Sequence, residues 1–201
     1  MQTPQPTLIS QAWPASEQSK WIRMVVLAFV GTLLIAIASK IKVPFYPVPM
    51  TMQTFVILGI GMAYGWRLGG ATVLLYLGEG AIGLPVFTGT PEKGIGLVYM
   101  MGGTGGYLFG YLLAVLAVGW LAERGWDRNL MTTAAAMLAG NILIFAPGLL
   151  WLGMLFGWDK PILDWGLWPF VGAEVFKIAL ATCLMPLAWM ALGRKGGDAS
   201  T

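Results

Sequence analysis

The chain has 201 residues, of which 57% are hydrophobic and only 10% charged, whereas soluble domains carry about 25% charged residues. This composition excludes an ordinary soluble domain and predicts an all-α integral membrane protein. The chain has no histidine and one cysteine, Cys183, which excludes a His-ligated metal, a catalytic histidine and a thiolate cluster. Its 12 basic residues are scattered singly, unlike those of a nucleic-acid-binding surface. We therefore expect no metal, no cofactor and no nucleic-acid partner.

The first 20 residues are polar and contain three prolines, and they lack the charged start and cleavage site of a signal peptide. We interpret residues 1–20 as a cytoplasmic tail, 21–193 as the membrane domain and 194–201 as a second tail. A helix that crosses the hydrocarbon core needs about 20 mostly apolar residues. The sequence then predicts a bundle of six membrane-spanning helices, at residues 21–41, 50–66, 68–87, 99–122, 130–156 and 168–192.

The segment VPFYPVP, residues 43–49, lies between the first two predicted spans. Its three prolines exclude a helix, because proline lacks the backbone N–H and clashes with the preceding turn. Non-helical backbone at membrane depth is tolerated where it lines a cavity or is buried in protein. We therefore expect an extended or re-entrant loop that closes one face of the bundle.

The orientation of the bundle follows from the basic residues, because loops rich in Lys and Arg stay in the cytoplasm. Alternating loops place seven basic residues on one face and four on the other. This bias favours both termini in the cytoplasm and external loops after the first, third and fifth spans. The seven are Lys20, Arg23, Arg67, Arg124, Arg128, Arg194 and Lys195, and the four are Lys40, Lys42, Lys93 and Lys160.

The run GEGAIG at residues 78–83 matches the dinucleotide fingerprint G-x-G-x-x-G. That motif binds a nucleotide only between a strand and a helix, and here it lies in an apolar span, so we interpret it as a helix-packing face. The chain also lacks a P-loop motif. If ATP drives this protein, another chain must hydrolyse it.

Small residues spaced four apart occur in three sets, each of which would align on one helix face. We interpret two glycine sets as internal packing within the bundle. The third set, on the first span, could instead be offered to a second protein. The glycine sets are Gly61, Gly65 and Gly69, and Gly102, Gly106 and Gly110; the third is Ala28, Thr32 and Ala36.

Three charged residues lie inside predicted spans and away from the ends of the first span, where Arg23 and Lys40 lie. An unpaired charge inside a span is costly and commonly marks function. Glu174 and Lys177 are three residues apart on the last helix, so they share a face and can partly neutralise each other. They form either a structural ion pair or part of a ligand site. Glu79 has no evident partner, and it could be a proton site or a structural hydrogen-bond acceptor.

The unusual segments fall on one side of the predicted bundle. Glu174 lies about five residues, or ~7 Å of helix, past Pro169 at the outer end of the last span. The prolyl loop (44–49) and the glycine-rich segment 85–107 lie on that same side. We therefore predict a pocket that opens to the exterior, covered by these loops and floored by the charges of the last helix.

Three runs of the chain, in this order, resemble the BioY family of biotin-binding S-components of energy-coupling-factor (ECF) transporters. The similarity extends from about residue 24 to residue 192. Glu174 and Lys177 match the acidic residue and lysine of the family's D-x-x-K pattern on the last helix. The three runs are VPMTMQTF at 48–55, GAIGLPVF at 80–87 and GGTGGYLFGY at 102–111.

The resemblance implies a six-helix S-component in the bacterial cytoplasmic membrane, with a substrate pocket that faces outside. It also implies a small-residue motif on the first helix, here Ala28, Thr32 and Ala36, that docks on a transmembrane coupling protein attached to two ABC ATPases. The chain departs from the family pattern twice. Glu174 replaces the usual Asp, and Met101 stands where proline is expected.

The chemistry of biotin agrees with this resemblance. Glu174 can accept hydrogen bonds from the two ureido N–H groups and Lys177 can donate to the ureido carbonyl, as charge-assisted bonds. The remaining apolar ring requires a mostly apolar pocket with a few fixed polar groups. Further candidates are Phe45, Tyr46, Phe87 and Tyr107 as walls, Lys93 or the amides of 102–106 for the carboxylate, and Thr88 and Asn141 as hydrogen-bonding side chains.

Two other functions stay open at this point. The first is a small-molecule transporter subunit for a different vitamin. The second is an intramembrane enzyme that uses Glu79 or Glu174 as general acid or base, although the sequence offers no nucleophile or metal set on facing helices. Ligand binding separates the first from a biotin transporter, and product formation would be needed to support the second.

Overall fold

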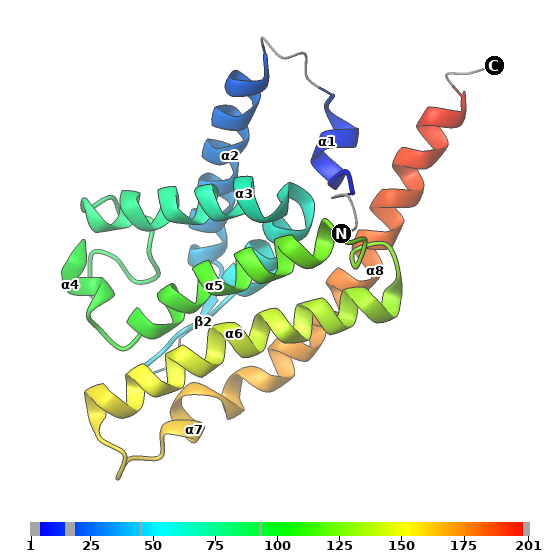
Figure 1. The fold of residues 1–201 in the computed structure, drawn as a ribbon. Helices are drawn as coiled ribbons and strands as arrows, with labels where there is room; N and C mark the ends of the chain where they lie inside the picture. The colour runs from blue at the N-terminus through cyan, green and yellow to red at the C-terminus, as the bar shows by residue number, and fades with distance from the viewer. Residues whose placement is uncertain (1–4, 15–18, 45, 93, 199–201) are drawn as a thin grey trace.

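The structure, a computed structural model, describes residues 5–14, 19–44, 46–92 and 94–198, and it is mostly helical (Figure 1). Four stretches of the described chain are long and apolar enough to cross a membrane. Three of them are α2 (Lys20–Lys40), α5 (Gly105–Ala122) and α6 (Leu130–Phe156). The fourth runs from the short α7 (Ile162–Gly166) through most of α8 (Trp168–Asp198). The predicted helical membrane protein is thus confirmed.

Helix α3 (Gln53–Ala81) covers the second and third predicted spans and folds back on itself at Gly65, where φ is 79° and ψ is 176°. The Nε2 atom of Gln53 donates to the Tyr76 hydroxyl at 2.7 Å, although 23 residues of straight helix would separate them by about 35 Å. Glycine adopts this positive φ without steric cost. The break therefore lies at Gly65, two residues before the predicted boundary at Arg67.

The prolyl segment connects the two short strands of a β-hairpin, and its described residues form no helix, as predicted. Strand β1 (Lys42–Val43) pairs antiparallel with β2 (Met50–Thr51), with Lys42 opposite Thr51. The hairpin leads directly into the first turn of α3. This arrangement fixes the backbone that precedes the helix, including the carbonyl of Thr51.

Two predicted spans extend further than the observed helices at the end of the bundle where this hairpin lies. The third was expected to reach residue 87, but α3 ends at Ala81 because Gly83 adopts a positive φ of 99° and Pro85 follows. The fourth was expected to start at residue 99, but a separate turn, α4 (Leu97–Met100), precedes the GGTGG run and α5 begins at Gly105. The intervening residues cover the site described below.

The opposite end of the bundle is tied together by the N-terminal segment, which contains the short helix α1 (Leu8–Ala12). The backbone N–H of Gln5 donates to the Glu123 carbonyl at 2.8 Å, and Arg128 donates to the Pro6 carbonyl at 3.2 Å. At this end α8 continues through residues 194–198, which were predicted to belong to the C-terminal tail.

Glycines allow α5 to pack closely against both α3 and α6. A Cβ added at Gly110 would lie 2.7 Å from the Cα of Ile144, and one at Gly61 would lie 3.1 Å from the Val115 carbonyl oxygen. These contacts confirm internal packing for Gly61 and Gly110. The prediction that each glycine set aligns on one helix face was wrong for two residues. Gly65 forms the bend of α3, and Gly102 precedes α5.

We predict that Gly110→Ala lowers thermal stability, because the new methyl group would meet the backbone of α6. Overpacking of this kind typically costs about 1–3 kcal/mol. The matched control is Gly78→Ala, where a Cβ would meet nothing within 4 Å. Thermal unfolding in detergent should show a lower midpoint for Gly110→Ala and an unchanged or higher one for Gly78→Ala. Equal midpoints would contradict the packing account.

Candidate functional site

A small cavity of about 30 Å³ lies among α3, α5, α6 and α8, where the hairpin and the α3–α5 connection meet them. Its walls come from segments far apart in the sequence, as predicted for a site covered by the prolyl and glycine-rich segments. Most of the lining is aromatic or aliphatic, with a few polar groups. The lining includes Val48, Pro49, Thr51, Gln53, Thr54, Phe87, Thr88, Tyr99, Thr104, Tyr107, Tyr111, Phe145, Phe170 and Glu174.

Glu174 and Lys177 form a buried ion pair in the first half of α8. The Lys177 Nζ atom lies 2.7 Å from Glu174 Oε1. Lys177 is 5% exposed and Glu174 is 7% exposed. Burying both charges costs several kcal/mol per ion, and good geometry with additional hydrogen bonds is needed to offset that cost. The end of β2 and the start of α3 supply those hydrogen bonds.

Thr54 and Thr51 complete the polar cluster around the pair. The Thr54 hydroxyl accepts from Lys177 Nζ at 2.9 Å and lies 2.9 and 3.0 Å from the two carboxylate oxygens of Glu174. Lys177 also donates to the Thr51 carbonyl at 2.6 Å. A lysine ammonium has three N–H donors, and here three acceptors surround it.

The two charges of the pair therefore face different surroundings. Glu174 lines the cavity, whereas Lys177 lines a shallow groove between the hairpin and α8. Each carboxylate oxygen can accept more than one hydrogen bond, so Glu174 retains acceptor capacity toward the cavity. Lys177 neutralises and orients this carboxylate from behind.

A second polar network holds the connection after α3 in place. The Thr88 hydroxyl lies 3.1 Å from Gln53 Oε1 and 3.2 Å from the Ser39 carbonyl oxygen, and it can donate to either. Tyr76 accepts from Gln53 and donates to the Val86 carbonyl at 3.2 Å. The predicted candidate Thr88 thus lines the cavity and also links the α3–α5 connection to α2 and α3.

Aromatic rings build the apolar walls. Phe87 stacks on Tyr99 with ring centroids 5.0 Å apart, and Tyr107 packs edge-on against Phe145 at 5.7 Å. The Tyr107 hydroxyl donates to the Gly166 carbonyl at 2.8 Å, which ties the start of α5 to the end of α7. Of the predicted wall residues, Phe87 and Tyr107 line the cavity, whereas Tyr46 is exposed.

The other predicted site residues lie elsewhere. Asn141 lines a groove between α6 and α8, which Glu174 and Phe145 also line, and it donates to the Met137 carbonyl at 3.1 Å. Lys93 and Phe45 lie outside the described residues. Among the described residues, no group of three or more His, Cys, Asp or Glu side chains could hold a metal ion.

The small-residue set on α2 faces the bundle in this structure. Thr32 is buried, and its hydroxyl lies 3.2 Å from Glu79 Oε1 and 3.0 Å from the Phe29 carbonyl. Ala28 and Ala36 are partly buried, and Ala36 packs against the hydrophobic core. The structure therefore gives Glu79 a hydroxyl partner that its sequence context did not reveal.

Sequence reasoning missed Gln53, Thr54 and Tyr76 as parts of the site. Gln53 and Thr54 lie within the run VPMTMQTF, and they are polar residues at the start of an apolar helix. That signal could have singled them out. Their partners, 23 to 123 residues away, follow only from the folded chain.

Comparison with known proteins decides the family. Residues 9–194 match the BioY family. The chain belongs to the BioY family. Family members with related sequences include the "Biotin transporter BioY" of Thermotoga maritima, 32% identical over 81% of this chain and 94% of the relative. The "Biotin transporter BioY2" of Lactococcus lactis subsp. cremoris is 34% identical over 78% of this chain and 84% of the relative.

One solved structure shares the fold of this BioY-family chain. It is described as the S-component for biotin from an ECF-type ABC transporter, and it matches with a TM-score of 0.71 and 24% sequence identity. The match covers 86% of this chain and 93% of that structure. Together with the apolar helices, this places the chain among multi-pass membrane proteins of the BioY fold.

We predict that Thr54→Val destabilises the ligand-free protein, because it removes the hydroxyl that contacts both members of the buried ion pair. Leaving buried polar groups unsatisfied typically costs about 1–3 kcal/mol each, and more for charged groups. The control is Thr72→Val, since the Thr72 hydroxyl bonds only the Leu68 carbonyl of its own helix at 2.8 Å among the described contacts. Thermal unfolding in detergent should show a clearly larger loss for Thr54→Val. Equal losses would mean that Thr54 does not support the pair.

Proposed function

We propose that this chain is the substrate-capture component of an ECF-type ABC importer and that it binds biotin from outside the cell. One observation carries this proposal: a buried carboxylate, Glu174, faces an aromatic-lined cavity while Thr54 and Lys177 hold it in place through hydrogen bonds. Biotin transporters of the same family, related over most of this chain, support the choice of ligand.

The cavity chemistry suits the ureido ring of biotin. The two ureido N–H groups would donate to the Glu174 carboxylate, as charge-assisted hydrogen bonds. The sequence alone suggested that Lys177 donates to the ureido carbonyl. Because Lys177 already contacts three acceptors, we propose instead that it orients Glu174. Thr104 and Tyr111 also line the cavity, and their hydroxyl groups are candidate donors to the ligand.

The apolar part of biotin would lie against the aromatic walls. Phe87, Tyr107 and Phe145 provide the apolar surface that small-molecule pockets use to enclose a ring. The cavity of about 30 Å³ gives room for about two or three water molecules, so biotin binding requires lining segments to move apart. The α3–α5 connection is a candidate, because Gly83, Gly89, Gly94 and Gly96 adopt positive φ there.

The proposed topology has six crossings. Each half of α3, on either side of Gly65, would cross the bilayer as a short helix, in addition to α2, α5, α6 and α8. Both termini would face the cytoplasm of a bacterial cell and the cavity would open outside. The distribution of Lys and Arg residues supports this orientation.

A transmembrane coupling protein and two ABC ATPases would energise uptake, since the chain carries no P-loop. We propose Ala28, Thr32 and Ala36 on α2 as the surface that docks on the coupling protein. Because Thr32 contacts Glu79 on α3 in this structure, docking would require α2 to rotate or shift so that this contact opens.

We predict that Lys177→Met weakens biotin binding by roughly 30-fold to several thousand-fold. Losing one partner of a buried, hydrogen-bonded charge pair at a binding interface typically costs about 2–5 kcal/mol. Glu174→Gln should do less harm, since its amide oxygen still accepts from one N–H group, and Glu174→Asp should be tolerated best. Isothermal titration of the monodisperse fraction measures these affinities. An affinity of Lys177→Met within about threefold of wild type, despite lower thermal stability, would show that the pair is only structural.

We predict that Ala28→Trp abolishes ATP-driven biotin uptake while biotin binding stays normal, because the indole would block close approach of the coupling protein. The control is Val26→Trp, at an exposed position of the same helix. Uptake into vesicles that hold the complete transporter tests the effect. If the Ala28→Trp variant shows normal uptake and still recovers the ATPases in a pull-down, the small-residue set on α2 does not dock on the coupling protein.

A further inference from the structure

Three arginines at the end of the bundle away from the cavity each lie over a tryptophan ring. The guanidinium carbon of Arg67 is 5.1 Å from the centroid of the Trp66 ring, and that of Arg124 is 3.2 Å from Trp120. Arg128 lies 4.3 Å from the ring of Trp189 on α8. We call these six residues the Arg–Trp belt.

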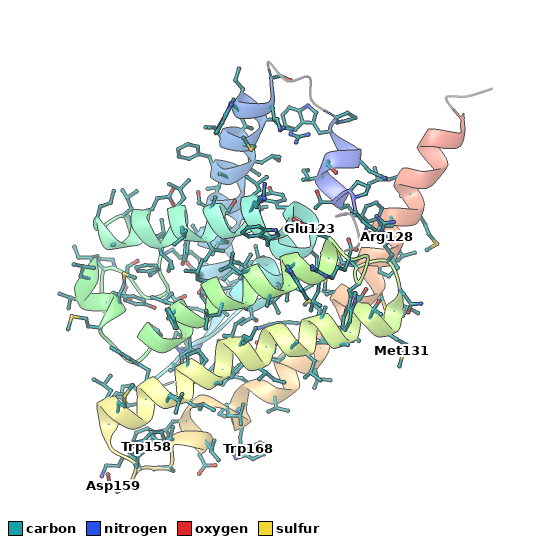
Figure 2. All side chains as sticks on the ribbon, viewed as in Figure 1. Glu123, Arg128, Met131, Trp158, Asp159 and Trp168 are labelled. Atoms are coloured by element: carbon teal, nitrogen blue, oxygen red, sulfur yellow. The ribbon has the colours of Figure 1, made fainter. Side chains whose placement is uncertain are left out.

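Two of the three Arg–Trp pairs of the belt are joined by a close helix contact. Gly119 contacts the backbone of Trp66 at the bend of α3, and it directly precedes Trp120 near the end of α5. Arg124 and Arg128 lie in the connection from α5 to α6. In Figure 2, Glu123 and Arg128 lie together at this end, while Trp158, Asp159 and Trp168 lie at the other.

Both the charge and the aromatic surface of the belt are accessible. All three arginines are exposed, and Trp66 and Trp120 are 37% and 48% exposed. Each of Arg124 and Arg128 uses one N–H for a backbone carbonyl, that of Trp120 and that of Pro6, respectively. A guanidinium has five N–H donors, so both keep free donors for another acceptor.

The nearby acidic groups only partly offset this positive charge. Glu123 is half-buried beside the bend at Gly65, and Asp127 is 1% exposed with its Oδ2 atom 2.6 Å from Trp189 Nε1. Burial raises the pKa of the Asp127 carboxyl, which favours its neutral form. Among the described residues, the salt bridges are Lys160–Asp159 and Lys177–Glu174, and neither involves the belt.

These features match one surface in particular, the headgroup layer of a membrane. Tryptophan is enriched at membrane–water interfaces, and exposed arginines near anionic lipids gain favourable energy. Arginine also binds phosphate oxygens through two parallel N–H donors. The opposite end presents lysines with acidic neighbours instead, such as Lys160 beside Asp159 at 3.0 Å.

We propose that the Arg–Trp belt binds the phosphate headgroup of an anionic glycerophospholipid. The indoles would lie among the glycerol and upper acyl groups, and the guanidinium groups of Arg67 and Arg124 would hold the phosphate. This site is separate from the cavity, so the proposal does not depend on which ligand the cavity takes.

Native mass spectrometry of the full chain in detergent, titrated with phosphatidylglycerol or phosphatidylcholine, tests this proposal. Wild type should bind phosphatidylglycerol more tightly than phosphatidylcholine. The double variant Arg67→Gln/Arg124→Gln should weaken phosphatidylglycerol binding by about 25-fold, at about fivefold for each arginine. The matched control, Lys42→Gln/Lys160→Gln at the opposite end, should bind as wild type does.

Equal affinity for the two lipids, or an unchanged affinity in the double variant, would overturn the proposal. Displacement of the bound lipid by a millimolar excess of inorganic phosphate would assign the site to a free anion and would also overturn it. If the double variant unfolds early in a thermal scan, Arg67→Lys/Arg124→Lys replaces it. That variant keeps the charge but loses the paired donors, so it should still prefer phosphatidylglycerol while binding it less tightly than wild type.

Discussion

The buried ion pair between Glu174 and Lys177 is the constraint on which the rest of the site depends. Two charges at 5–7% exposure inside an apolar bundle are stable only if their remaining donors and acceptors are used. Thr54, in the first turn of α3, and the Thr51 carbonyl, at the end of β2, meet this requirement. The hairpin places the Thr51 carbonyl, and the packing of α8 against α3 places Thr54, within hydrogen-bond distance of the pair.

This constraint also assigns different roles to the two charges. Lys177 does not line the cavity and already contacts three acceptors, while Glu174 borders the cavity itself. A carboxylate fixed in this way is a preorganised acceptor, which lowers the entropic cost of ligand binding. A ligand with two neighbouring N–H donors and an apolar body fits such a site, and a ureido ring fused to a thioether ring has both.

Much of this fold was predictable from the sequence, because membrane helices must be long, apolar and hydrogen-bonded within themselves. The fifth predicted span coincides with α6 at residues 130–156, and the predicted convergence of Glu174 with the prolyl and glycine-rich segments is confirmed. The errors lie where glycine decides the backbone. Gly65 bends α3, and Gly83 and the GGTGG run end or delay helices that hydropathy alone would continue.

The polar partners of the site were harder to predict. Thr54 and Lys177 lie 123 residues apart, and Thr32 and Glu79 lie 47 apart, so no local spacing connects them. The direction of the Lys177 side chain depends on where the hairpin places one carbonyl group. The sequence could identify the ion pair and its helix, but not which of the two charges faces the cavity.

The most direct test of this account is equilibrium binding of biotin, riboflavin and thiamine to the wild-type chain purified without its energising module. Saturable binding of one biotin per chain, with no measurable binding of the other two vitamins, is the predicted result. No saturable biotin binding by folded protein, or equal binding of another of these vitamins, would contradict the account.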